Sequence, residues 1–177
     1  MTRQLNHVET LHRPGERQLA IQLFRLLGFE PVDSGRHWFT SFVDPCAERD
    51  WSNNAIYCSE VGTEQWALEQ RLVAVGGDAL EAYAEMLRTR PQYSTHFGIR
   101  VGSEAELDEL VERVRHAGES DAQLAGRVQV RGVYRHDEPD AIAPNMTQVF
   151  IWTDVVAAGL LTLGQHIELQ WQLSSVA

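Results

Sequence analysis

The sequence contains one pattern twice: a short strand-like segment that carries a histidine, followed by an apolar helical pattern that ends near a glycine. His7 lies 21 positions before Gly28, and His96 lies 22 positions before Gly118. Repetition of a supersecondary unit indicates a fold that is built from paired copies. We therefore expect two similar modules, each with a histidine at the same place.

The first copy reads as one strand, one helix and three further strands. Residues 4–11 have the pattern of a strand, and the leucines that follow are spaced as on one face of a helix. Pro14 suits the first turn of this helix, and Gly28 suits its end. Three short apolar runs follow, each of strand length, at 29–32, 37–43 and 55–61.

The second copy repeats this order. A strand at 94–101 leads to Ser103 and Glu106, whose spacing is that of a capping box at the start of a helix. Three more strands are expected at 127–134, 148–155 and 166–173. Between the copies, residues 62–92 predict a helical connector with one helix from Thr63 and another over 79–87, separated by the Gly76-Gly77 pair.

These elements predict an α+β fold with two paired βαβββ modules, whose curved mixed sheets enclose a metal cavity. The expected boundaries are 1–61 for the first module, 62–92 for the connector and 93–177 for the second module. Together they would form one domain, since 177 residues suffice for one well-packed core.

Composition excludes several classes of function. The formal net charge is −10 and the chain has no lysine, which argues against a nucleic-acid partner. No apolar run approaches the ~20 residues of a membrane span, and the N-terminus lacks a signal-peptide core. The two cysteines are too few for a disulfide scaffold. We expect a cytoplasmic protein that binds a small-molecule substrate. A homodimer is compatible with the sequence.

Strand alternation places candidate metal ligands on one side of the sheets. If Ile167 and Leu169 pack under a helix, then Glu168 points the other way, and the same reasoning applies to His96. The same parity turns His7 inward together with Glu9. Two imidazoles and one carboxylate form a facial triad that suits Fe(II), Mn(II) or another divalent ion and leaves coordination positions open.

Three segments in this order resemble the vicinal oxygen chelate superfamily, also called the glyoxalase/bleomycin-resistance/dioxygenase fold. They are Leu5-Asn6-His7-Val8, Thr95-His96-Phe97-Gly98-Ile99 and Gly164-Gln165-His166-Ile167-Glu168-Leu169. The resemblance covers nearly the whole chain and is weakest in the connector. It implies that His7, His96 and Glu168 bind one divalent ion, with Fe(II) favoured and with Mn, Ni, Co or Zn as alternatives.

Some members of this superfamily have a fourth ligand on the last strand of the first copy. Aligning the two copies here puts Tyr57 opposite Glu168, and a tyrosine is not a usual ligand at that position. Glu60 would face the helix side on a regular strand, although a bulge could turn it inward. The pattern therefore resembles the members that have three ligands.

Several further residues are candidates for the chemistry. Glu9 and Tyr57 are the candidate acid or base, although Tyr57 also suits an aromatic wall. Arg100 shares the inward parity and could bind substrate or pair with Glu9. His166 shares the parity of Glu168 but lies near a strand end, where we expect it to meet solvent. The tryptophans are expected mainly to pack, and the remaining substrate-binding candidates are Gln170, Phe150 and Trp152.

The resemblance implies a metal-dependent enzyme that acts on a small organic molecule with two neighbouring oxygens. The favoured reaction is an Fe(II) dioxygenase-like oxidation. The alternatives are a glyoxalase-type isomerase, epimerase or lyase, and a drug- or metabolite-sequestering protein without catalysis. Fold by itself does not choose among these chemistries.

Overall fold

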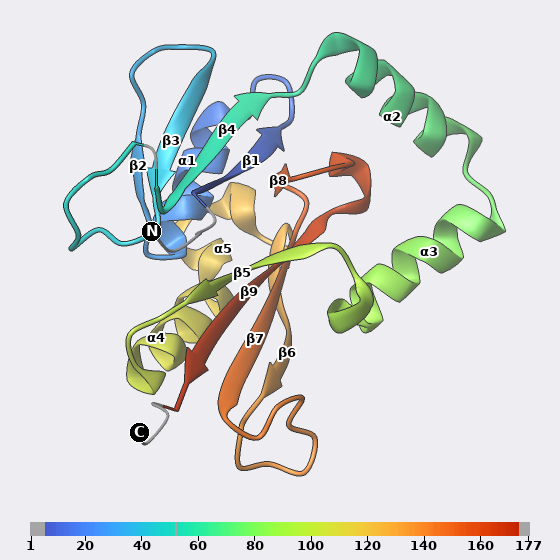
Figure 1. Ribbon diagram of the computed structural model, residues 1–177. Helices are drawn as coiled ribbons and strands as arrows, with labels where there is room; N and C mark the ends of the chain where they lie inside the picture. Colours follow the sequence, from blue (N-terminus) through green and yellow to red (C-terminus); the bar gives the residue numbers. More distant parts are fainter. Residues whose placement is uncertain (1–5, 52, 174–177) are drawn as a thin grey trace. The chain divides into compact units, whose positions relative to one another are not determined.

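The first sheet is built mainly from the N-terminal third of the chain. The structure is a computed structural model that describes residues 6–51 and 53–173. The strand predicted from residue 4 is seen from His7, since residues 4 and 5 lie outside the described part. The sheet has the order β2-β3-β4-β1-β8, in which β1 and β4 are parallel (Figure 1). Its elements are β1 (His7–His12), α1 (Arg17–Leu26), β2 (Glu30–Val32), β3 (Trp38–Phe42), β4 (Ala55–Glu60) and β8 (Val156–Ala157).

The second sheet has the order β5-β9-β7-β6, and its one parallel pair is β5 with β9. The helix α4 packs against β6, β7 and β9. The elements are β5 (His96–Arg100), α4 (Glu104–Arg115), α5 (Ala117–Ser120), β6 (Val128–Tyr134), β7 (Met146–Thr153) and β9 (Gln165–Gln172). Short 3-10 turns lie at Pro91–Tyr93, Ala122–Leu124 and Leu161–Leu163.

Strand order shows the predicted repeat directly. The spatial order β2-β3-β4-β1 in the first sheet corresponds to the order β6-β7-β9-β5 in the second. The parallel pair is β4 with β1 in the first sheet and β9 with β5, at the corresponding place, in the second. The prediction of an α+β fold with two mixed sheets is therefore confirmed. The division at 61/62 and 92/93, and a two-fold relation between the modules, stay predictions.

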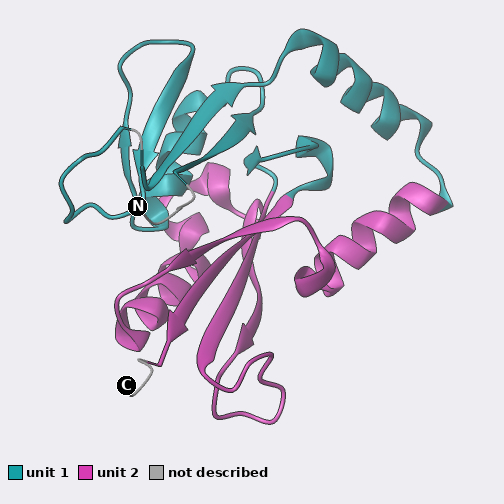
Figure 2. Cartoon of the chain, in the orientation of Figure 1, with its two compact units in different colours: residues 1–78, 154–164 teal, residues 79–153, 165–177 magenta. Residues whose placement is uncertain are grey.

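The chain forms two compact units, which Figure 2 colours separately. Unit 1 comprises residues 1–78 and 154–164, and unit 2 comprises residues 79–153 and 165–177. The expected connector helices are present as α2 (Thr63–Val75) and α3 (Asp78–Thr89). No helix in the described ranges is long and apolar enough to span a bilayer.

Both helices that were expected to end near a glycine have boundaries that differ from expectation. The first helix begins at Arg17 and not at Pro14, because Gly15 has a φ of +74°, which a helix cannot contain. The second helix does not run to Gly118 but ends at Arg115, and Gly118 lies within α5. A Cβ at Gly118 would lie 3.0 Å from the Cβ of Ala125, so this glycine serves close packing.

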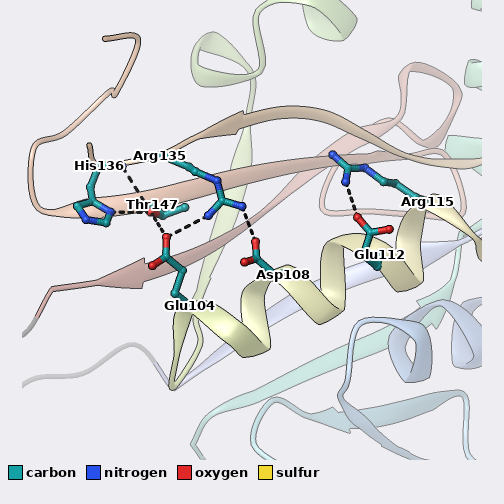
Figure 3. Close-up of polar contacts among 7 residues, drawn as sticks. All are labelled: Glu104, Asp108, Glu112, Arg115, Arg135, His136 and Thr147. Atoms are coloured by element: carbon teal, nitrogen blue, oxygen red, sulfur yellow. Dashed lines mark hydrogen bonds and ion pairs between the residues drawn. The ribbon is translucent and has the colours of Figure 1, made fainter. Parts of the chain in front are cut away.

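The start of α4 is fixed to the adjoining hairpin. The Ser103 N-cap is confirmed, since the Glu106 backbone N–H donates to the Ser103 hydroxyl at 3.1 Å. The Glu106 carboxylate accepts from the backbone N–H of Gly102 at 2.9 Å and not from that of Ser103, so the second bond of the expected capping box is made one residue earlier. Arg135, at the end of β6, donates to Glu104 at 3.0 Å and to Asp108 at 2.6 Å (Figure 3). These bonds hold the start of the helix against the β6–β7 hairpin.

Strand β8 was not predicted, because two residues show no alternation. It belongs to the segment 154–164, which joins β7 to β9 in sequence but pairs with β1 in unit 1. The fully buried Glu69 of α2 holds this segment, accepting hydrogen bonds from the backbone N–H of Thr162 at 2.9 Å and from Gln65 at 2.8 Å. The Glu69 carboxylate thus accepts a backbone N–H of this segment that lies beyond the two residues paired in β8.

The two cysteines should react very differently with thiol reagents. Cys46 is exposed, whereas Cys58 is fully buried, and burial raises the pKa of its thiol to about 12. Because the thiolate is the reactive form, a disulfide reagent at pH 8 should label one thiol quickly in the native protein and both after unfolding. Equal labelling rates would contradict the packing of β4 under α1, and Cys46→Ser should abolish the fast phase.

Candidate functional site

Strand β1 carries polar residues on both of its faces, and those on the side of α1 are buried. Thr10 and His12 are buried, and the ring of His12 stacks on Phe39, whose ring in turn contacts Phe24 of α1 at 5.8 Å. Alternation then places His7 and Glu9 on the opposite face, as predicted. Both of these side chains are exposed and line a cavity.

This cavity lies entirely within unit 1 and has a volume of about 660 Å³, which suits a small organic molecule. Its walls come from β1, β3 and β4 and from the loops that flank them. Sequence reasoning named three of its residues as site candidates and expected Trp38, on β3, mainly to pack. The loop residues were missed because they have no periodic pattern. The lining residues are His7, Glu9, Ser34, Arg36, Trp38, Thr40, Trp51 and Tyr57.

Tyr57 forms one wall of the cavity. Its ring centroid lies 5.2 Å from that of His7. Its hydroxyl donates a hydrogen bond to the backbone carbonyl of Trp51. Glu9 accepts a hydrogen bond from the Ser59 hydroxyl at 3.2 Å. The Tyr57 proton is therefore engaged by the backbone, whereas the Glu9 carboxylate keeps further acceptor capacity for a ligand.

The second predicted histidine meets the predicted glutamate in unit 2. The Nε2 atom of His96 lies 3.2 Å from Oε2 of Glu168. The Nδ1 atom of His96 lies 2.8 Å from the carbonyl oxygen of Ser94, to which it can only donate. The other oxygen of Glu168 accepts a hydrogen bond from the Gln148 amide at 2.7 Å.

This arrangement fits a divalent metal. A neutral imidazole that donates from Nδ1 turns the lone pair of Nε2 toward the carboxylate, so two electron-rich atoms face each other. Two donors about 2.1 Å from one ion lie roughly 3.0–3.4 Å apart, and the observed separation falls in this range. The Ser94 carbonyl and the Gln148 amide are the outer partners that hold such ligands in orientation.

The registers of the two sheets confirm the alignment of Tyr57 with Glu168. His7 pairs with Ala55, two residues before Tyr57, and His96 pairs with His166, two residues before Glu168. The first copy thus carries a histidine beside a tyrosine where the second carries a histidine beside a carboxylate.

The expectation that His166 meets solvent is wrong, because β9 is an inner strand flanked by β5 and β7. His166 is 1% exposed, and its Nδ1 atom lies 2.8 Å from the Ser94 hydroxyl. Burial is the largest cause that lowers the pKa of His166 to about 4, and the electrostatic influence of the neighbouring His96 and Arg131 side chains adds to it. A neutral His166 therefore braces the Ser94 turn that orients His96.

Strand β7 supplies the rest of this face. Phe150 is fully buried, and its ring meets that of His96 edge-on at 5.3 Å. Trp152 pairs with His166 in register, and the guanidinium of Arg131 lies 5.6 Å from its ring. Arg131 is the extra residue where the β6–β7 register shifts, and such bulges redirect side chains. Three buried polar atoms here have no partner among the described residues: His166 Nε2, Trp152 Nε1 and Gln148 Oε1.

Two other candidates can be placed. Glu60 accepts a hydrogen bond from the Gly15 backbone at 2.9 Å, and β4 shows no register shift, so Glu60 faces the helix side as expected. Arg100 is exposed at the end of β5 beside Gln170, and in the described part of the chain it makes no ion pair.

The structure thus brings His96, Glu168, Phe150 and Trp152 together in unit 2, and His7, Glu9 and Tyr57 together in unit 1. Within the described residues of either unit, no group of three His, Cys, Asp or Glu side chains is placed to hold a metal ion. The joint ligation by His7, His96 and Glu168 remains a prediction.

Comparisons with known proteins concern the fold. No protein-family model matches the chain, and no curated protein does. A Bacillus anthracis protein assigned to the glyoxalase family is 11% identical, with 97% of each chain covered and a TM-score of 0.50. Oxidase ChaP-H2 is 15% identical over 100% of both chains, with a TM-score of 0.48. Lactoylglutathione lyase from Agrobacterium tumefaciens is 14% identical over 93% of this chain and 91% of that chain, with a TM-score of 0.43. The chain therefore shares its fold with the Bacillus anthracis glyoxalase-family protein.

Proposed function

We propose that this chain is a divalent-metal enzyme that acts on a small organic molecule with two neighbouring oxygen atoms, and that His7, His96 and Glu168 hold the metal. The observation that carries the proposal is the His96–Glu168 pair. Its Nε2 and Oε2 atoms lie 3.2 Å apart, and each side chain has a further hydrogen-bond partner, Ser94 for His96 and Gln148 for Glu168. A bound divalent ion would supply a Lewis acid with coordination positions left for the substrate.

The residues around the pair would bind and orient the substrate. Trp152 would offer apolar surface, the fully buried Phe150 would support the His96 ring from within the core, and the free acceptor of Gln148 would offer a hydrogen bond within a buried setting. Arg100, at the end of β5, and Gln170, its partner on β9, would contact polar groups of the substrate. Buried groups of this kind are used when a ligand replaces the water that would otherwise satisfy them.

An Fe(II)-dependent oxidation is the first candidate reaction. Glu60 faces α1 and so supplies no fourth carboxylate, and three protein ligands leave room for substrate and oxygen together. A glyoxalase-type isomerisation is the second candidate, favoured by the Glu9 carboxylate in the cavity. In this reaction the Glu9 carboxylate would take a proton from the substrate carbon next to a carbonyl group and return it to the neighbouring carbon. The Tyr57 hydroxyl is bonded to the backbone, so its ring would only line the cavity.

One experiment separates these reactions. Anaerobic protein loaded with Fe(II) should bind 4-methylcatechol and consume oxygen when air is admitted, and Glu168→Gln should abolish this uptake. Glu60→Gln is the matched control, since its carboxylate faces the helix side. Proton exchange at a ketone substrate with Co(II) and no oxygen would favour the isomerase instead. Binding of small aromatic compounds with neither activity would favour sequestration.

A further inference from the structure

The cavity of unit 1 has a composition that selects for flat ligands. Two indoles and a phenol, from Trp38, Trp51 and Tyr57, stand on its walls. Trp38 is 38% exposed and Trp51 is 51% exposed, which is unusual for side chains that could bury their rings in the core. Aromatic rings left open on a concave surface favour stacking with another planar ring.

The cavity also holds a cation with unused hydrogen-bond donors. The guanidinium of Arg36 lies 5.8 Å from the ring of Trp38 and makes no ion pair or hydrogen bond with the part of the chain that is described. Elsewhere in unit 1, Arg17 is paired with Asp33, and Arg49 is paired with Glu30. An unpaired guanidinium presents a planar fork of donors that matches a carboxylate.

We propose that this cavity binds a planar aromatic anion, with its ring against the aromatic walls and its acidic group on Arg36. The inference names the substrate class of the proposed enzyme and rests on that function for its biological meaning. The formal charge of the chain, −10, repels anions at a distance, so capture would depend on this local cation. Where the ligand carries a hydroxyl group, the Glu9 carboxylate would accept a hydrogen bond from it.

The test uses 2-naphthoate as the probe and metal-free protein prepared with a chelator. Isothermal titration calorimetry should show binding of 2-naphthoate, weaker binding of cyclohexanecarboxylate and weaker binding still of 2-naphthyltrimethylammonium. Arg36→Met and Trp38→Leu should each weaken 2-naphthoate binding about tenfold or more, because each removes one half of the recognition.

Arg49→Met is the matched control. Arg49 also stands over an aromatic ring, at 5.9 Å from that of Phe42, but does not line the cavity. This variant should bind 2-naphthoate as the unchanged protein does. In ¹H–¹⁵N spectra, the indole signals of Trp38 and Trp51 should shift on addition of 2-naphthoate, and that of Trp66 should not.

Three results would overturn the inference. They are no binding of 2-naphthoate, binding of 2-naphthoate to Arg36→Met as tight as to the unchanged protein, and tighter binding of 2-naphthyltrimethylammonium than of 2-naphthoate to the unchanged protein. Failure of the proposed function is a separate outcome. It would be seen as unchanged metal retention in His96→Ala, a variant that should bind 2-naphthoate normally, because His96 lies in unit 2 and lines no part of this cavity.

Discussion

Replacing His96 with alanine should remove most of the bound metal from protein purified without chelators. The variant loses the one imidazole whose Nε2 faces Glu168, and a carboxylate with a single remaining outer partner is a weak ligand. Loss of an outer partner typically costs 10–100-fold in metal affinity, so loss of a ligand should exceed about 100-fold. Competition with a chromophoric chelator measures the change.

Glu168→Gln should behave in the same way, since it keeps the volume and removes the charge. His116→Ala is the matched control, because His116 follows α4 on the surface and bonds only to glutamates there. Metal affinity unchanged from the wild type in both His96→Ala and Glu168→Gln would refute the proposed site.

Phe150→Ala should lower the free energy of unfolding by about 3–5 kcal/mol, as large-to-small changes in a closed core do. The side chain is 1% exposed, and its ring contacts those of His96 at 5.3 Å and Tyr134 at 5.9 Å. Urea unfolding of the metal-free protein, followed by circular dichroism, measures the loss. Phe150→Leu keeps most of the apolar volume and should lose much less. A change below about 1 kcal/mol for Phe150→Ala would show that this ring does not support the unit 2 sheet.

Alternation along strands was enough to predict the faces of the candidate site. Glu168 lies between Ile167 and Leu169, which are both fully buried, and the side on which it must point follows from a period of two. To predict that His96 contacts Glu168, the register between β5 and β9 must also be known, and sequence patterns do not set it. The resemblance to a known superfamily supplied that step.

Features that depend on loops or on strand order were missed. Arg36 and Trp51 lie outside regular strands, so nothing in their spacing placed them in a cavity with His7. The burial of His166 follows from the inner position of β9, and the redirection of Arg131 follows from a bulge. Gly132 was a usable signal of that bulge, since a glycine inside a strand often marks one. In the structure a Cβ at Gly132 would lie 2.7 Å from the Tyr134 ring.

The central claim is that His7, His96 and Glu168 bind the same metal ion. X-ray absorption at the iron edge of the Fe(II)-loaded protein tests it most directly, because imidazole rings give a characteristic multiple-scattering signal that can be counted. Two imidazoles are expected in the unchanged protein, and one each in His7→Ala and His96→Ala loaded at high Fe(II). An imidazole count that stays the same when His7 is replaced would contradict the claim.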